Sequence, residues 1–112
     1  MTTTIPLRER ELQNAVISLA RMRGWRVAHF LPHGTGKNRG TWRTPVQADG
    51  AGYPDLTLVR GDRLLFVELK QDGKYPNPKQ RAWLDALEAT PAEVYVWRPA
   101  DWYAGRVESV LS

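Results

Sequence analysis

Residues 52–70 read GYPDLTLVRGDRLLFVELK, and this stretch decides the fold. Two apolar runs flank the tetrapeptide RGDR at 60–63, which is a turn signal, and this pattern predicts a β-hairpin. A two-residue loop would pair Arg60 with Arg63, and a four-residue loop would pair Val59 with Leu64. Both loops give the same register, because both contain an even number of residues.

In this register Asp55 lies directly opposite Glu68. Residues opposite each other point to the same face of a sheet, with their Cβ atoms about 5 Å apart, and the strand period of two adds Lys70 to that face. The pattern therefore predicts three charged groups at one end of the hairpin. The opposite face is apolar throughout and is expected to face the core: Leu56, Leu58, Leu65, Val67 and Leu69.

Two explanations account for this group of charges. Two carboxylates that face each other across a strand pair repel and destabilise the pair. A divalent cation between Asp55 and Glu68 would remove the repulsion, because hard cations bind carboxylate oxygens. Alternatively, Lys70 neutralises the acids in a structural ion cluster. The three residues by themselves leave both explanations open.

The composition limits the class of protein. A length of 112 residues predicts one domain over 1–112. Sixteen Lys and Arg against twelve Asp and Glu give a net charge of +4, which permits a polyanionic partner without requiring one. The chain has no Cys, which excludes disulfides and thiolate zinc sites and suits the cytoplasm. No apolar run approaches the roughly 18 residues of a membrane span, so we expect no membrane partner.

The segments around the hairpin predict helices on both sides of it. Thr4 is expected to cap the first helix, and Gly24 to end it. Asn77 is expected to cap a later helix opened by Pro78. The resulting order is α-β-β-β-α-β followed by a short helix, which is an α/β fold with a central mixed sheet flanked by helices. The expected ranges are a helix to about 23, a strand over 25–31, the hairpin, a helix over about 78–90, a strand over 93–97 and a helix over 106–111.

Three further polar residues have two interpretations each. Glu11 lies at the edge of the apolar stripe of the first helix, where it either joins the acids or is a solvated flank residue. Gln80 lies on the inward stripe of the later helix and needs a partner there. It either reaches the carboxylates or bonds to backbone. His29 is interpreted as a histidine packed at the edge of the core rather than as a ligand.

Residues 32–54 form an unusually long connection with five of the nine glycines. Loops of this length are uncommon in small domains and are usually functional or disordered. Basic side chains interleaved with an aromatic ring suit a phosphate backbone and an unstacked base, although a flexible linker is the alternative. We expect the loop over 71–77 to be polar and mobile. The candidate DNA-binding residues are Lys37, Arg39, Trp42, Arg43 and Lys74.

The motif Pro54-Asp55, followed thirteen residues on by Glu68-Leu69-Lys70, resembles the PD-(D/E)xK nuclease superfamily. The helix before the hairpin and the helix after it occur in the order that this superfamily shows. Within it, the chain resembles the VRR-NUC group in its small stand-alone form, which is typical of phage-borne genes. The resemblance rests on GYPDL at 52–56, VELK at 67–70 and PKQRAWL at 78–84, and implies a restriction-endonuclease-like core.

The resemblance also implies a metal centre. In this group Asp55 and Glu68 would bind catalytic Mg²⁺ or Mn²⁺, with the main-chain carbonyl of Leu69 as a further ligand. Glu11 matches the position of a first-helix glutamate that many superfamily members add to the metal shell.

The remaining implications concern catalysis and substrate. Lys70 would position or activate the attacking water, and Gln80 would help to organise the site beside Asp55 and Glu68. Small members of the group are similar to Holliday-junction resolvases and act as homodimers on branched DNA. We therefore expect a metal-dependent, structure-selective DNA endonuclease in the cytoplasm of a bacterium or a phage-infected host cell.

Two other classes of function remain as alternatives. One is a DNA-binding module whose motif is catalytically silent. The other is an interaction domain that exposes an aromatic patch formed by Trp97, Trp102 and Tyr103.

Overall fold

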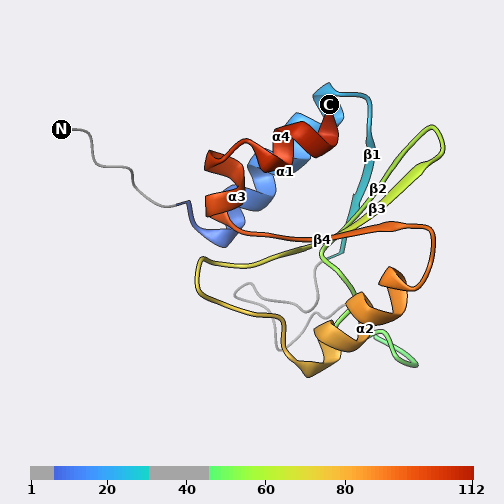
Figure 1. The fold of residues 1–112 in the computed structure, drawn as a ribbon. Helices are drawn as coiled ribbons and strands as arrows, with labels where there is room; N and C mark the ends of the chain where they lie inside the picture. Colours follow the sequence, from blue (N-terminus) through green and yellow to red (C-terminus); the bar gives the residue numbers. More distant parts are fainter. Residues whose placement is uncertain (1–6, 31–45) are drawn as a thin grey trace, which may run out of the picture.

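The structure, a computed structural model, describes residues 7–30 and 46–112. It contains one four-stranded mixed sheet in the order β1-β2-β3-β4, in which only β3 and β4 run parallel. Figure 1 shows α1, α3 and α4 on one side of the sheet and α2 on the other, which confirms the expected α/β fold. The elements are α1 (Glu9–Met22), β1 (Arg26–His29), β2 (Leu56–Arg60), β3 (Arg63–Leu69), α2 (Pro78–Glu88), β4 (Glu93–Trp97), α3 (Pro99–Tyr103) and α4 (Arg106–Leu111).

The hairpin of β2 and β3 has the predicted register. Arg60 pairs with Arg63 at the turn, and Leu56 pairs with Val67 at the other end. Gly61 opens the two-residue turn with a φ of 61°, a left-handed conformation that glycine adopts without steric cost. Extending the register by one residue places Asp55, which lies just before β2, opposite Glu68.

The main core lies between the sheet and the helices α1 and α4. All five apolar hairpin residues predicted to face it are fully buried. Apolar side chains from α1 and α4 pack against them, with Trp25 and Trp97 at the margins. The helical members of this core are Leu12, Val16, Ala20, Val107 and Leu111.

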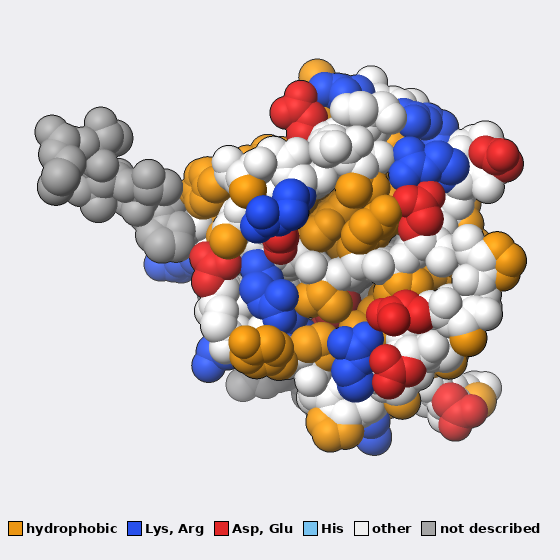
Figure 2. Space-filling view, in the orientation of Figure 1, with side chains coloured by type: hydrophobic (Ala, Val, Ile, Leu, Met, Phe, Trp, Pro, Cys, Tyr) orange, Lys and Arg blue, Asp and Glu red, His pale blue; other side chains and the backbone are white. Residues whose placement is uncertain are grey.

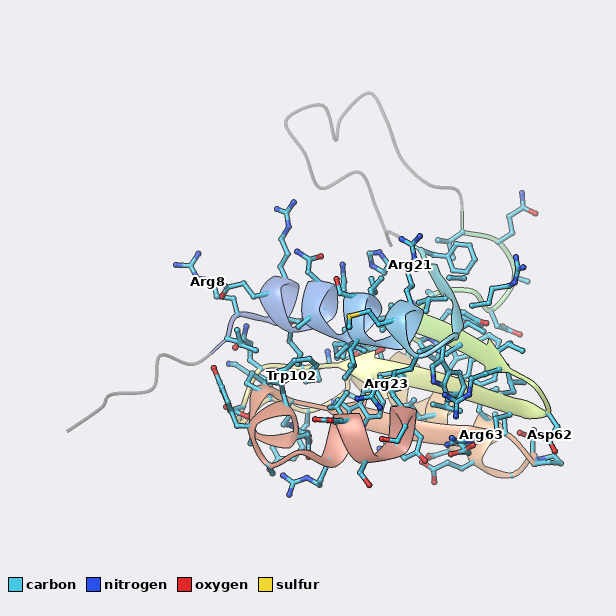
Figure 3. All side chains as sticks on the ribbon, turned by 90° about the horizontal axis from the view of Figure 1, so that it is seen from above. Arg8, Arg21, Arg23, Asp62, Arg63 and Trp102 are labelled. Atoms are coloured by element: carbon cyan, nitrogen blue, oxygen red, sulfur yellow. The ribbon has the colours of Figure 1, made fainter. Side chains whose placement is uncertain are left out.

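The first helix begins later than expected. Arg8 is its N-cap, and the Arg8 N–H donates a hydrogen bond of 2.8 Å to the Oε1 of Glu11. A glutamate at the third helical position can bond the N-cap N–H in this way, so the start does not require the expected Thr4 cap. Thr4 itself lies outside the described residues. Arg8 and Arg21 point away from the sheet (Figure 3).

A smaller apolar cluster lies under α2 on the other face of the sheet. The ring of Tyr53 makes edge-to-face contacts with Phe66 and Trp83, at centroid distances of 6.1 and 5.1 Å. The helix is short and covers only part of this face. Val59 and Leu64 therefore remain 41% and 37% exposed.

The aromatic residues at the C-terminal end do not form a common surface. Trp97 is 3% exposed and belongs to the core, Trp102 packs partly against the core, and Tyr103 is 51% exposed. The expected aromatic patch is therefore reduced to one ring, because the β4 register turns Trp97 inward beside Leu69. Within the described part of the chain, no helix combines the length and the apolar character needed to cross a bilayer.

Candidate active site

The structure brings together the three charged residues of the hairpin. We call the end formed by Asp55, Glu68 and Lys70 the carboxylate end. Glu68 is the penultimate residue of β3 and is 1% exposed, whereas Asp55 is half-buried. The backbone N–H of Leu69 donates a hydrogen bond of 2.8 Å to Asp55 Oδ2, which fixes the Asp55 carboxylate beside the end of β3.

The carboxylate of Glu68 is only half satisfied. Lys70 Nζ lies 3.6 Å from its Oε2 atom. The other oxygen, Oε1, is buried and has no hydrogen-bond partner among the described residues. A buried charged oxygen without a partner is costly, so the lysine by itself does not complete a structural ion cluster. The carboxyl groups of Glu68 and Asp55 interact with each other. A cation held between them could take the free Oε1 as a ligand, and the site therefore fits a divalent metal.

Burial raises the pKa values of both Glu68 and Asp55. Burial raises the pKa of Glu68 to about 7, and the nearby charge of Asp55 adds to the rise while Lys70 opposes it. Burial also raises the pKa of Asp55, whereas the Leu69 N–H and Lys70 lower it. Pairs of perturbed acids of this kind are concentrated at functional sites.

A glutamate that the sequence analysis did not select lies near these acids. Burial and the charge of Asp55 both raise the pKa of Glu9, while Lys70 lowers it. Glu11 is exposed and instead bonds the first turn of its own helix. The spacing of Glu9 before Leu12 and Val16 places it on the buried stripe of α1, and this signal in the sequence could have identified it.

Gln80 occupies a different position from the one favoured by the resemblance. Its Oε1 atom accepts a hydrogen bond of 2.9 Å from the Asn77 N–H, and its own N–H donates one of 2.9 Å to Asn77 Oδ1. This is a capping box at the start of α2, so the interpretation in which Gln80 bonds to backbone describes the structure. The expected cap at Asn77 and the expected start at Pro78 are both present.

Gly52 connects α2 to the carboxylate end. Its φ is 87°, and a Cβ atom at this position would lie only 2.7 to 2.9 Å from backbone atoms of Lys79 and Gln80. Only glycine lets the chain pass this close to α2. Asp55 follows three residues later, so the close approach helps to set where its carboxylate lies.

The other predicted residues divide into two groups. His29 is half-buried and pairs with Leu56 at the edge of the sheet, and its charge lowers the pKa of Asp55. Lys74 is exposed in the loop after β3. The remaining four DNA-binding candidates lie outside the described residues: Lys37, Arg39, Trp42 and Arg43.

The described surface offers few protein ligands for an ion. Over residues 7–30 and 46–112, no three side chains of His, Cys, Asp or Glu gather closely enough to hold a metal by themselves. Mg²⁺ usually binds one or two carboxylates and keeps several waters, so the pair of Asp55 and Glu68 suits it. On the face in Figure 2, basic and acidic side chains are interspersed, without a large basic patch.

A hollow of about 450 Å³ lies beside α2, but it is separate from this site. Its lining includes Ala51, Lys79 and Trp83 and none of the three residues of the carboxylate end. The indole N–H of Trp83 donates to the Asp49 carbonyl at 2.7 Å and so fastens the preceding loop to α2.

Known proteins provide an independent comparison. The family model of the VRR-NUC domain matches residues 35–101, a range that contains Asp55, Glu68 and Lys70. The solved structure of a VRR_NUC domain protein has a TM-score of 0.62 and 23% sequence identity, with 96% of this chain and 93% of that chain covered. This second likeness concerns the fold. None of the curated proteins matches the sequence significantly. The chain belongs to the VRR-NUC domain family, a family of nucleases.

Proposed function

We propose that this protein is a metal-dependent endonuclease that hydrolyses phosphodiester bonds in DNA. The observation that carries the proposal is the buried Glu68 Oε1, which lacks a hydrogen-bond partner in the described part of the chain and lies beside a second carboxylate. A catalytically silent DNA-binding module would have no use for this costly arrangement. Family membership supports a nuclease.

Asp55 and Glu68 would hold Mg²⁺ or Mn²⁺, with the Leu69 carbonyl as a further ligand. Glu9, rather than Glu11, would support the site from α1, because burial and the charge of Asp55 raise the pKa of Glu9, whereas Glu11 bonds the first turn of its own helix. Within the described residues Glu9 does not lie close enough to Asp55 and Glu68 to complete a three-residue metal group. When bound, the cation would polarise the scissile phosphate and lower the pKa of a water molecule. The Leu69 N–H fixes one oxygen of Asp55, Oδ2, beside the end of β3.

Lys70 supplies the positive charge from the protein itself. Its side chain is 17% exposed, and Nζ lies 3.6 Å from Glu68 Oε2, so the ammonium is packed beside the acids. A lysine in this position can orient the attacking water and offset charge on a phosphate oxygen. Gln80 supports the site indirectly, since it caps the helix against which Gly52 packs.

The substrate and assembly follow from the chemistry of paired cuts. We propose branched DNA, such as a Holliday junction, as the substrate and a homodimer as the active form. Two symmetric cuts call for two sites related by a twofold axis, and such pairs are the commonest oligomers. Light scattering should give about twice the monomer mass of 12.8 kDa. A monomer at working concentration would contradict this part of the proposal.

The first experiment is a cleavage assay with three end-labelled DNAs: a four-way junction, a duplex of the same sequence and a single strand. We expect the junction to be cut with Mg²⁺ or Mn²⁺, and the cutting to stop with chelator or in Asp55→Asn. If the protein binds the junction in the presence of metal but leaves it uncut, the result would instead indicate a catalytically silent DNA-binding module. Equal cutting of junction and duplex would refute selectivity while leaving the nuclease assignment in place.

A further inference from the structure

An exposed aromatic ring lies at the same end of the sheet as the acids. Tyr75, in the loop between β3 and α2, is 77% exposed. The guanidinium carbon of Arg98 lies 5.0 Å from the centroid of this ring, in a cation–π contact. A single exposed tyrosine is ordinary. The exposure of Tyr75 by itself therefore does not indicate a function, and its position and contacts must be considered.

Arg98 connects this ring to the chain next to the proposed catalytic lysine. β3 and β4 run parallel, with Leu69 paired to Trp97. The N–H of Lys70 continues the pairing, because it donates a hydrogen bond of 3.0 Å to the Trp97 carbonyl. Extending the register by one residue places Arg98 beside Lys70, on chains that lie about 4.8 Å apart in a sheet. The residue that holds the ring is therefore the lateral neighbour of Lys70.

The loop that carries the ring is fastened, which corrects the expectation of a mobile loop. The guanidinium of Arg98 donates two hydrogen bonds, of 3.0 and 2.7 Å, to the Lys74 carbonyl. The Ala100 N–H donates to Asp72 Oδ1 at 3.1 Å, and the Lys74 N–H bonds the Gln71 carbonyl at 3.1 Å. The contacts from Arg98, between β4 and α3, and from Ala100 in α3 were not visible in the polar composition of the loop.

A ring that is fixed but exposed is suited to stacking on a ligand. Little conformational entropy is lost when a partner stacks on it, since the loop is already ordered. Base–aromatic stacking is a main source of affinity for unpaired nucleic acid. Arg98 lies over the ring, and Lys74 is the exposed residue before it in the loop. Their positive charges would attract the phosphates that flank such a base.

We propose that Tyr75 stacks on an unpaired nucleobase next to the cleaved phosphodiester, with Lys74 and Arg98 facing the adjoining phosphates. Among branched DNAs, one with an unpaired nucleotide at the branch point should then be bound more tightly than a fully paired junction. This inference rests on the proposed nuclease function and specifies which feature of the DNA the site recognises.

The test uses branched DNA with a single unpaired 2-aminopurine at the branch, titrated with the full-length protein in the presence of chelator so that nothing is cut. Stacking on tyrosine should quench the 2-aminopurine fluorescence. In Tyr75→Ala we expect the quenching to disappear and the affinity to fall roughly 5- to 160-fold, which corresponds to the 1–3 kcal/mol lost when stacking residues are truncated. Tyr75→Phe and Tyr75→Trp should preserve both signals, because the aromatic ring remains.

Two controls separate stacking from a general loss of binding. A fully paired duplex should bind Tyr75→Ala as well as it binds the wild-type protein. Tyr103→Ala removes another exposed tyrosine, 51% exposed on α3, and should change neither the quenching nor the affinity. With metal present, Tyr75→Ala should raise KM for branched DNA more than it lowers kcat.

Each contrary result has a defined meaning. Unchanged quenching and affinity in Tyr75→Ala, or an equal loss on paired duplex, would overturn the stacking proposal. A loss of dimer mass in light scattering would assign Tyr75 to a protein interface instead. If the wild-type protein quenches 2-aminopurine but never cuts, the nuclease proposal fails and the stacking proposal stands. If it binds no DNA at all, both fail.

Discussion

The two ends of the β2–β3 hairpin contain similar numbers of charges but treat them differently. At the turn end, formed by residues 60–63, the guanidinium carbons of Arg60 and Arg63 lie 4.5 and 5.0 Å from the Trp25 ring centroid. Arg60 also donates hydrogen bonds to the Arg23 and Leu111 carbonyls. These interactions fasten the C-terminal end of α4 to the sheet.

Arg63 continues the same arrangement at the turn end. It makes two hydrogen bonds to Glu93, of 2.8 and 2.7 Å, and a third to the Val110 carbonyl. The pairing with Arg63 lowers the pKa of Glu93, and burial together with Glu93 raises the pKa of Tyr95 to about 12.

The carboxylate end is the reverse case, because Glu68 Oε1 is buried without a partner in the described residues and burial raises the pKa of Glu68 to about 7. A charge cluster whose groups are bonded to one another stabilises the fold. A cluster that leaves a buried carboxylate oxygen free lowers the stability of the empty protein and is available to a ligand. We base the proposed assignment of the site on this difference between the two ends, and not on the number of charges at each.

The largest expected effect comes from making the same substitution at both ends. Glu68→Gln should lower the cleavage rate at least about a hundredfold, the scale of losing one charge-stabilising group. It should leave the metal-free stability unchanged or raised, because it removes a buried charge. Glu93→Gln should keep the cleavage rate and lower the free energy of unfolding by about 1 kcal/mol, since the pair with Arg63 is partly exposed. Initial cleavage rates and urea denaturation measure both. Near-normal cutting by folded Glu68→Gln would remove the contrast.

The next effect compares two glycines with positive φ. Gly61 at the turn end has open space around its Cβ position, whereas Gly52 faces the backbone of α2. Gly61→Ala should cost only the left-handed conformation, about 1 kcal/mol. Gly52→Ala adds overpacking against backbone and should cost about 3 kcal/mol in total, with slower cutting because Asp55 moves. Urea denaturation of both variants tests this, and equal costs would show that the close approach has no energetic weight.

The smallest effect is a pair of opposite pH dependences in metal-free protein. The folded pKa of Glu68, about 7, lies above its ordinary value, so the folded state binds more protons than the unfolded state between about pH 4.5 and 7. Stability should therefore fall as the pH rises through this range, by at most about 1.4 kcal/mol for each pH unit. The pKa of Glu93 is lowered, so its smaller contribution is lost as the pH falls below about 4.5.

Chelated samples melted across the pH range test these slopes. Glu68→Gln should remove most of the slope between pH 4.5 and 7, with a remainder from the raised pKa values of Asp55 and Glu9, and should leave the acid-side loss in place. Glu93→Gln should remove the acid-side loss and leave the slope between pH 4.5 and 7. If the stability of the wild-type protein rises steadily from pH 5 to 7, the claim that burial raises the pKa of Glu68 is wrong.

Side chains whose position depends on local pairing could be predicted, and those whose position depends on distant contacts could not. The cap at Asn77 and the start of α2 at Pro78 were readable because Asn is a preferred N-cap and Pro suits the first helical position. The capping-box rule was not applied to Glu11, which accepts a hydrogen bond from the N-cap residue Arg8. Glu11 was interpreted instead as a candidate for the metal site or as a solvated residue. The Tyr75 ring contacts Arg98, which is far away in the sequence. The pairing of β3 with β4 brings Arg98 to the loop.

The sequence by itself determined the hairpin register, the core-facing side of the hairpin and the meeting of Asp55, Glu68 and Lys70. Strand periodicity and the RGDR turn are sufficient for that, since side chains alternate strictly along a paired strand. Only the tertiary structure decided that Glu9 and not Glu11 approaches the acids, that Gln80 bonds its own helix start, and that Glu68 keeps one oxygen free. These outcomes depend on burial and on contacts between elements distant in the chain, and a local pattern does not contain that information.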